Sequence, residues 1–396
     1  MGAMARLSNL TAIWENIREV DLNQYRQAAE QALNIILVCT PGLPGSALAE
    51  QMRIDPHHPK MQTHTPLLVT ELGVAQDYKD AHLVIILANS SQASSPEMIL
   101  AQSLLNHGKR VLLIENTARA APGAGKAVIS SQQAGFILAG SVAEAGFLTH
   151  TFVPAVIRLM PDHLLALGRQ FPLFRVAIAN HLINETCLAN AAYSLTTGIG
   201  EIVPVLGIPF YITDMIVLTK SQAFLAYKLG LALGYSTSWR DYVSEFGGVI
   251  GGGFVWRQLS RSLVGLVPGW GIIPKVAIAY SGTYVVGHAI LQWYLTGRHL
   301  TARQMRALSR QSFERGKVFA LGLVQKAPLP RRKRQPSDLP APQDQDTQSN
   351  KPGLFKRKRA SKQLPPAAQQ VCPFCGRSNA PDASFCQYCG EKLNVG

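Results

Sequence analysis

The sequence predicts a parallel-sheet α/β domain, then an apolar α-helical domain, then a small cysteine-rich module. Short apolar runs alternate with turn-forming and helical stretches up to about residue 160. Long, nearly uncharged helical stretches follow, and four cysteines cluster after residue 370. A chain of 396 residues has room for two or three cores. Its composition, 47% hydrophobic and 16% charged with a mean hydropathy of +0.08, is typical of soluble parts joined to an apolar part.

Residues 1–33 are expected to form an N-terminal amphipathic helix, because apolar residues recur at helical spacing over 10–33. The first 20 residues contain no apolar core of signal-peptide length. Arg6 also stands where myristoylation needs Ser or Thr. We therefore expect the soluble parts of the protein to stay in the cytoplasm.

Residues 34–160 are expected to form the α/β domain. Its strands are short, continuous apolar runs, and a helix-length segment at 95–107 lies between two of them. Strands of this kind, alternating with helices, are typical of a parallel sheet that is covered on both faces. The predicted strands are 34–39, 82–88, 110–115 and 135–139.

A glycine-bearing turn follows the first predicted strand, where a phosphate-binding loop would lie. A working loop needs a Lys for the β- and γ-phosphates and a Ser or Thr hydroxyl for Mg²⁺. Counted from Gly42, the Lys position holds Leu48 and the hydroxyl position holds Ala49. Gly42, Gly45 and Ser46 would offer a weak remnant site through backbone N–H groups at the start of the next helix. A β–α turn without a ligand is the other interpretation.

Three further segments of this domain look like strands of a nucleotide-binding fold. They are the run 82–88, GKRVLLIEN with Asn116 at its end, and FILAGSV with Ser141. In this pattern residues 34–150 resemble an Era-like small GTPase, and Asn116 is what remains of the guanine-reading motif. The resemblance implies a degenerate GTPase-like domain. Without the Lys, the hydroxyl and the guanine-reading Asp, phosphate charge has no counter-ion, so we expect neither catalysis nor a GTP cofactor.

Residues 161–320 are expected to form the apolar helical domain. Over residues 189–219 the only charged residues are Glu201 and Asp214, and over residues 263–295 the only residue with a formal charge is Lys275. The runs 202–219 and 276–295 have about the length needed to cross a hydrocarbon core of roughly 30 Å. They predict either membrane insertion or core helices of a water-soluble bundle.

Ordered motifs run through this helical region. They are a V-P-V-x-G-x-P turn, a D-x-x-x-L-T-K-S-Q helix and an I-P-K-x-A-I-A-Y-x-G-T-Y helix. Over residues 166–300 the chain thereby resembles the domain of unknown function in bacterial YcjF-like membrane proteins. That domain is also found fused behind Era-like GTPase domains. The family is membrane-associated and has no assigned chemistry, so the resemblance implies a location at the inner or cytoplasmic membrane rather than an activity.

The positive charge of the chain is concentrated in one region. Residues 298–362 hold 17 Lys and Arg against four acids, which accounts for +13 of the formal net charge of +14. Anionic lipid is the simplest partner for such a flank, and nucleic acid or mere solvation are the alternatives. The first six basic residues after the last apolar run are Arg298, Arg303, Arg306, Arg310, Arg315 and Lys317.

Residues 321–370 are rich in Pro, Gln, Ser and clustered basic residues, and are expected to form a disordered basic linker.

Residues 371–396 are expected to form a zinc ribbon. Two CxxC pairs ten residues apart supply four thiolates, the ligand set of a tetrahedral structural Zn²⁺ site. The predicted ligands are Cys372, Cys375, Cys386 and Cys389.

These patterns favour a non-enzymatic, membrane-associated adaptor or regulatory protein, with the zinc ribbon as a docking module for protein partners not identified by the sequence. Two alternatives stay open. One is an NTP-binding switch protein with an unusual phosphate loop, and the other is a zinc-ribbon protein that binds nucleic acid through its basic segment.

Overall fold

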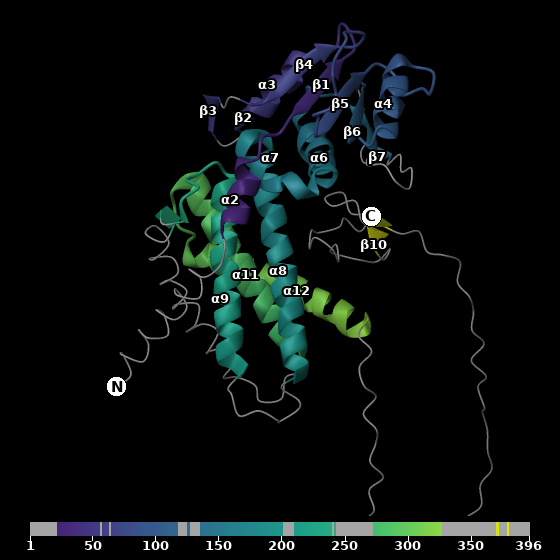
Figure 1. Ribbon diagram of the computed structural model, residues 1–396. Coiled ribbons are helices and arrows are strands. Elements are labelled where there is room, and N and C mark those ends of the chain that lie inside the picture. Colours follow the sequence, from purple (N-terminus) through teal and green to yellow (C-terminus); the bar gives the residue numbers. More distant parts are fainter. Residues whose placement is uncertain are drawn as a thin grey trace, which may run out of the picture.

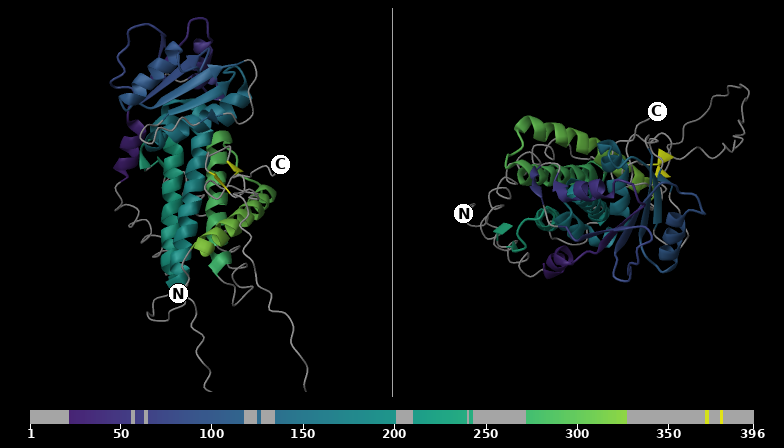
Figure 2. Two further views of the ribbon diagram at one scale, coloured as in Figure 1. Left: turned by 90° about the vertical axis from the view of Figure 1, so that its right-hand side faces the viewer. Right: turned by 90° about the horizontal axis from the view of Figure 1, so that it is seen from above.

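The computed structural model describes residues 22–55, 58–62, 65–117, 125–126, 135–200, 210–239, 241–242, 272–326, 370–371 and 378–379. Figure 1 shows an α/β unit stacked on the end of a bundle of long helices. The left view in Figure 2 shows the same stacking, with the long helices running away from the sheet. The predicted order, a parallel-sheet unit followed by a helical unit, is confirmed.

Five parallel strands form the sheet, in the order β4-β1-β5-β6-β8, and a two-residue strand, β7, pairs antiparallel with β8. All four predicted strands are present within one residue of their expected ends. The fifth parallel strand, β4, was not predicted. The strands are β1 (Ile35–Cys39), β4 (Leu67–Glu71), β5 (Leu83–Ala88), β6 (Val111–Asn116), β7 (Gly125–Lys126) and β8 (Gly135–Gly140), and β2 (Ile54–Asp55) with β3 (His58–Gln62) forms a separate hairpin.

Helices cover both faces of the sheet. Helix α3 (Gly45–Arg53) follows β1 and buries Leu48 and Met52 against one face. Helix α4 (Pro96–Asn106) follows β5 and packs on the opposite face. The hydroxyl of Ser95 accepts a hydrogen bond from the N–H of Met98 at 3.2 Å, which satisfies one of the free donors at the start of α4.

The sheet and the helical bundle share one hydrophobic core. The core runs from the α3 face of the sheet through the short helices α5 (Ala145–Phe147), α6 (Val153–Leu159) and α7 (Leu164–Gln170) into the bundle. The rings of Phe152 and Phe174 lie with their centroids 5.9 Å apart inside it. The boundary expected between residues 160 and 161 therefore falls within continuous packing, and the two units are joined by buried apolar contacts.

The described residues include four long helices of the bundle: α8 (Arg175–Gly200), α9 (Phe210–Ala232), α11 (Ile272–Thr296) and α12 (Ala302–Lys326). Helix α11 contacts the other three. A Cβ atom on Gly287 would lie 2.8 Å from Ile183 of α8 and 3.2 Å from Leu225 of α9. Thr283 accepts a hydrogen bond from the Asn190 side chain at 2.9 Å. These small residues therefore allow close helix packing within the bundle.

No helix within the described ranges combines the length and the apolar character needed to cross a membrane. The sequence left two interpretations of the run 276–295 open, membrane insertion and the core of a helical bundle. That run forms most of α11, whose surface is covered by neighbouring helices. Part of 202–219 and the side chain of Asp214 lie outside the described residues.

Two expected boundaries are corrected. Helix α2 (Asn23–Glu30) ends before residue 33, and Leu33 is fully buried where the chain leads into β1. Helix α12 runs to Lys326, so the basic linker begins later than residue 321. Residues 1–21 and 327–369 lie outside the described part of the chain.

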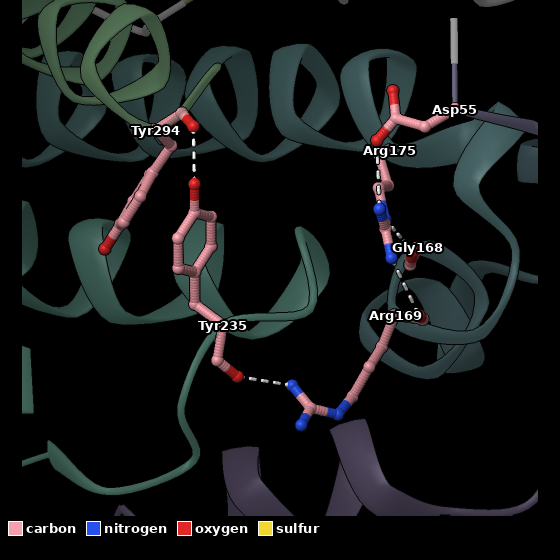
Figure 3. A network of polar contacts seen from close by, with 6 residues as sticks. All are labelled: Asp55, Gly168, Arg169, Arg175, Tyr235 and Tyr294. Atoms are coloured by element: carbon pink, nitrogen blue, oxygen red, sulfur yellow. Dashed lines mark hydrogen bonds and ion pairs between the residues drawn. The ribbon is translucent and has the colours of Figure 1, made fainter. Parts of the chain in front are cut away.

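A chain of polar contacts crosses the junction between the two units (Figure 3). Arg175, the first residue of α8, pairs with Asp55 of the β2–β3 hairpin at 2.9 Å, and both side chains are largely buried. The same guanidinium donates to the carbonyl of Gly168 at 3.3 Å. Arg169 in turn donates to the carbonyl of Tyr235 at 2.7 Å, and the Tyr235 hydroxyl donates to the carbonyl of Tyr294. The network ties α3, through its following hairpin, to α7, α8 and α11.

Candidate functional site

The candidate site lies at the carboxyl ends of the parallel strands. Numbered along the chain, these strands stand in the order 2-1-3-4-5 across the sheet. The connection after β1 leads to α3 on one face, whereas the connection after β5 leads to α4 on the other. Open α/β sheets bind ligands at such a switch point. Gly42, Gly45 and Ser46 follow β1 directly and lie at this position.

The turn after β1 is short. Only residues 40–44 separate the end of β1 from the start of α3. The N–H of Leu43 donates to the carbonyl of Thr40 at 3.1 Å, and the N–H of Gly45 donates to the carbonyl of Leu43 at 2.8 Å. Gly42 adopts a φ of +86°, a left-handed conformation that favours glycine. Gly42 therefore has a role in closing the turn.

Gly45 has a different role, because it packs against the preceding strand. A Cβ atom at this position would lie 2.0 Å from Sγ of Cys39 and 3.0 Å from its Cβ. Burial, together with the carboxylate of Glu71, raises the pKa of the Cys39 thiol to about 11. Cys39 is therefore a neutral core residue. The close approach of α3 to β1 is sufficient reason for glycine at position 45.

The positions of the missing lysine and hydroxyl face the core. Leu48 is fully buried, and Ala49 is 3% exposed. Both belong to the cluster between α3 and the sheet. Ser46, in contrast, is exposed on the first turn of α3. A side chain at position 48 or 49 would have to leave the hydrophobic core before it could reach a phosphate group outside the sheet.

A buried carboxylate lies next to this turn. Glu97, in the first turn of α4, is 5% exposed, and its Oε1 accepts a hydrogen bond from the Thr40 hydroxyl at 2.6 Å. Burial alone would raise the pKa of Glu97. Hydrogen bonds from Thr40, Ser95 and the backbone N–H groups of Glu97 and Asn89 outweigh it and lower the pKa. These hydrogen bonds favour the carboxylate form of Glu97 beside the turn.

Asn116 lies further along the same edge. It ends β6, and β5 stands between β6 and β1, so two strand spacings, about 10 Å, separate Asn116 from the glycine turn. Its Oδ1 accepts a long hydrogen bond from the N–H of Val142 at 3.5 Å. The neighbouring Glu115 accepts a hydrogen bond from the Ser91 hydroxyl at 2.5 Å. Asn116 therefore supports the turn after β8.

Sequence reasoning missed Thr40, Glu97, Ser91 and Glu115. A usable signal was present, because polar residues directly follow β1 and β5, and the carboxyl ends of parallel strands meet at one edge. Ser95 also marks the start of a helix that places Glu97 in its first turn.

Within the described ranges, no group of three or more His, Cys, Asp and Glu side chains is arranged to hold a metal ion.

The four predicted zinc ligands, Cys372, Cys375, Cys386 and Cys389, lie outside the described residues. Two short strands are described beside them. β9 (Gln370–Val371) pairs antiparallel with β10 (Ser378–Asn379), with Val371 opposite Ser378. The first CxxC pair therefore lies in the connection between two paired strands.

The chain matches no family model, and no curated protein or solved structure matches it. The fold described above therefore stands on its own geometry. The similarity to Era-like GTPases and to YcjF-like proteins stays a prediction from the sequence.

Proposed function

We propose that this protein is a non-enzymatic adaptor or regulatory protein attached to the cytoplasmic face of a membrane. In this proposal the α/β unit is a GTPase-like domain that no longer binds or hydrolyses nucleotide. The strand order and the placement of α3 and α4 on opposite faces support a common origin with nucleotide-binding α/β domains.

The observation that carries the proposal is the turn at residues 40–44. A phosphate loop wraps the phosphates with backbone N–H groups and brings a lysine to them. Here Gly45 packs on Cys39, and Leu48 lies in the core. The Glu97 carboxylate accepts a hydrogen bond from the Thr40 hydroxyl. This arrangement disfavours a triphosphate by close packing and by charge, so an adaptor role fits it better than an NTP-driven switch.

The corresponding test is steady-state phosphate release from GTP and ATP by the full chain in the presence of Mg²⁺. We expect release no faster than in buffer, because Leu48 and Ala49 occupy the positions of the lysine and the metal-binding hydroxyl that stabilise the transition state. Release that saturates with nucleotide and is abolished by chelating Mg²⁺ would contradict the proposal and favour the switch protein.

The zinc ribbon is the second part of the proposal. Four cysteine thiolates in two CxxC pairs fit a structural Zn²⁺ site, and the paired strands β9 and β10 flank the first pair in the sequence. Bound zinc would supply the folding energy of the module, which we propose binds a protein partner.

Metal analysis of the full chain tests the zinc site. We expect about one zinc per chain in the purified protein and none after Cys375→Ser with Cys389→Ser. We expect the thermal unfolding of the sheet and bundle to stay unchanged, because the proposed module obtains its folding energy from its own metal ion. Zinc content that is unaffected by the double substitution would rule out this ligand set.

A further inference from the structure

Helix α12 carries a straight line of basic residues on its outer side. We call Arg303, Arg306, Arg310 and Lys317 the basic stripe. Their spacings of three, four and seven residues place them on one side of an α-helix. The three arginines are exposed, and the Lys317 side chain is 39% exposed. Glu314, the one acid in the α12 sequence, pairs with Lys317 at 2.7 Å.

The opposite side of α12 is fixed against α11. The hydroxyl oxygens of Ser312 and Ser281 lie 2.9 Å apart, and a Cβ atom on Gly316 would lie 2.9 Å from the backbone of Ala277. These contacts set the rotation of α12 about its axis. The basic stripe is therefore held toward solvent.

Arg315 does not belong to the stripe, although the sequence grouped it with these residues. It is 6% exposed and donates a hydrogen bond to the Tyr284 hydroxyl at 3.2 Å. Its guanidinium also lies 5.5 Å from the centre of the Tyr284 ring. The positive charge of Arg315 therefore contacts Tyr284 inside the bundle and does not face solvent.

The first turn of α12 is held by its own cap. Thr301 and Gln304 form a reciprocal pair, in which the Thr301 N–H donates to Gln304 Oε1 at 2.9 Å and the Gln304 N–H donates to the Thr301 hydroxyl at 3.3 Å. Residues 302–307 are all exposed, so tertiary packing contributes little to this turn. The cap therefore stabilises the helical geometry of the turn that carries Arg303 and Arg306.

Exposed apolar side chains continue the outer side of the helix. Val318 is 47% exposed and Leu321 is 46% exposed. Leu321 follows Lys317 by four residues, so the two lie on the same side of α12. Figure 1 shows the C-terminal part of α12 extending to one side of the bundle. The outer side of α12 therefore combines cations with apolar residues in an accessible position.

We propose that the outer side of α12 is the surface by which the protein lies on an anionic lipid bilayer. The basic stripe contacts the acidic headgroups, and Val318 and Leu321 enter the interface beside them. Adjacent apolar side chains favour lipid over nucleic acid, because nucleic-acid backbones offer them no apolar phase. The inference rests on the membrane attachment proposed above and names the face and the lipid charge that provide it.

Partition of the full chain onto vesicles tests the inference. The vesicles contain phosphatidylcholine with or without about 30% phosphatidylserine, and bound protein is separated by sedimentation. Each basic residue near an anionic surface contributes about five-fold in binding, so Arg306→Gln with Arg310→Gln should weaken partition roughly 25-fold. The matched control is Arg26→Gln with Lys79→Gln, which removes the same charge from exposed positions on α2 and on the loop after β4.

We expect the control pair to bind almost as well as the wild type. Val318→Ser with Leu321→Ser should weaken the binding that persists at high salt, since apolar insertion is not screened. Equal partition of the stripe and control variants would overturn this inference alone. Failure of the wild type to bind phosphatidylserine vesicles would also overturn lipid attachment in the proposed function. Stripe-dependent binding to a generic duplex, without vesicle binding, would assign the surface to nucleic acid and overturn the inference.

Discussion

Arg175→Met is expected to lower the free energy of unfolding by roughly 3–5 kcal/mol, the usual cost of removing one partner from a buried ion pair. The Asp55 side chain is 7% exposed, and the substitution deprives it of a guanidinium 2.9 Å away. It also removes the donors that bind the carbonyls of Gly168 and Arg169. Urea denaturation followed by circular dichroism measures the change.

A matched control is available at a second ion pair in the same junction. Arg110 pairs with Asp162 at 3.0 Å, but these side chains are 29% and 72% exposed. Because water screens this pair, Arg110→Met should cost no more than about 1 kcal/mol. Asp55→Leu combined with Arg175→Met should recover part of the loss, since the buried carboxylate that lost the guanidinium is then also replaced by an apolar side chain. A cost for Arg175→Met no larger than for Arg110→Met would refute the structural role of the buried pair.

Gly45→Ala is expected to destabilise the protein by about 1–3 kcal/mol, the range for overpacking a filled core. The added methyl group would meet the Cys39 sulfur, because the clash distance is 2.0 Å. Cys39→Ala in the same chain should recover a substantial part of the loss by removing that sulfur. The four proteins of this double-mutant cycle, compared by urea denaturation, give the coupling free energy.

Gly42→Ala serves as the control for this cycle. A Cβ atom at position 42 meets nothing within 4 Å, and the cost of the substitution comes from the φ of +86°. An alanine in this left-handed conformation costs about 1–2 kcal/mol, and Cys39→Ala should not recover it. If Cys39→Ala rescued both glycine variants equally, or neither, the packing explanation for Gly45 would be wrong.

The sequence was sufficient to predict the buried strands and insufficient for β4. Strand β5 is a continuous apolar run that is buried at every position, so its composition identifies it. Strand β4 lies at the edge of the sheet, where Leu68 and Val69 are 46% and 40% exposed, and its sequence ends in Thr and Glu. Edge strands carry a weaker hydrophobic pattern because only part of their surface is covered.

The apolar helices show a different limit of sequence reasoning. A helix that is apolar on all sides is buried either in lipid or in the centre of a protein, and composition does not separate the two. Helix α11 is apolar because α8, α9 and α12 surround it. The ion pair of Arg175 could not be predicted from the sequence either, because Asp55 lies 120 residues away in the chain.

The packing role of Gly45 could not be predicted from the sequence, although the buried side of α3 could be predicted from Leu48 and Ala49. Positions 48, 49 and 52 form an apolar stripe at helical spacing, and all three side chains are buried. This stripe indicates that position 48 faces the core. The contact between Gly45 and Cys39, in contrast, depends on how closely α3 approaches β1, which no pattern of residue types specifies.

Equilibrium titration of the full chain with fluorescent GTP and ATP, with and without Mg²⁺, tests the proposed loss of nucleotide binding most directly. The packed turn at residues 40–44 and the Glu97 carboxylate predict no saturable, Mg²⁺-dependent binding at any accessible nucleotide concentration. Saturable binding in the micromolar range that requires Mg²⁺ would contradict this prediction and show that the sheet edge still serves as a nucleotide switch.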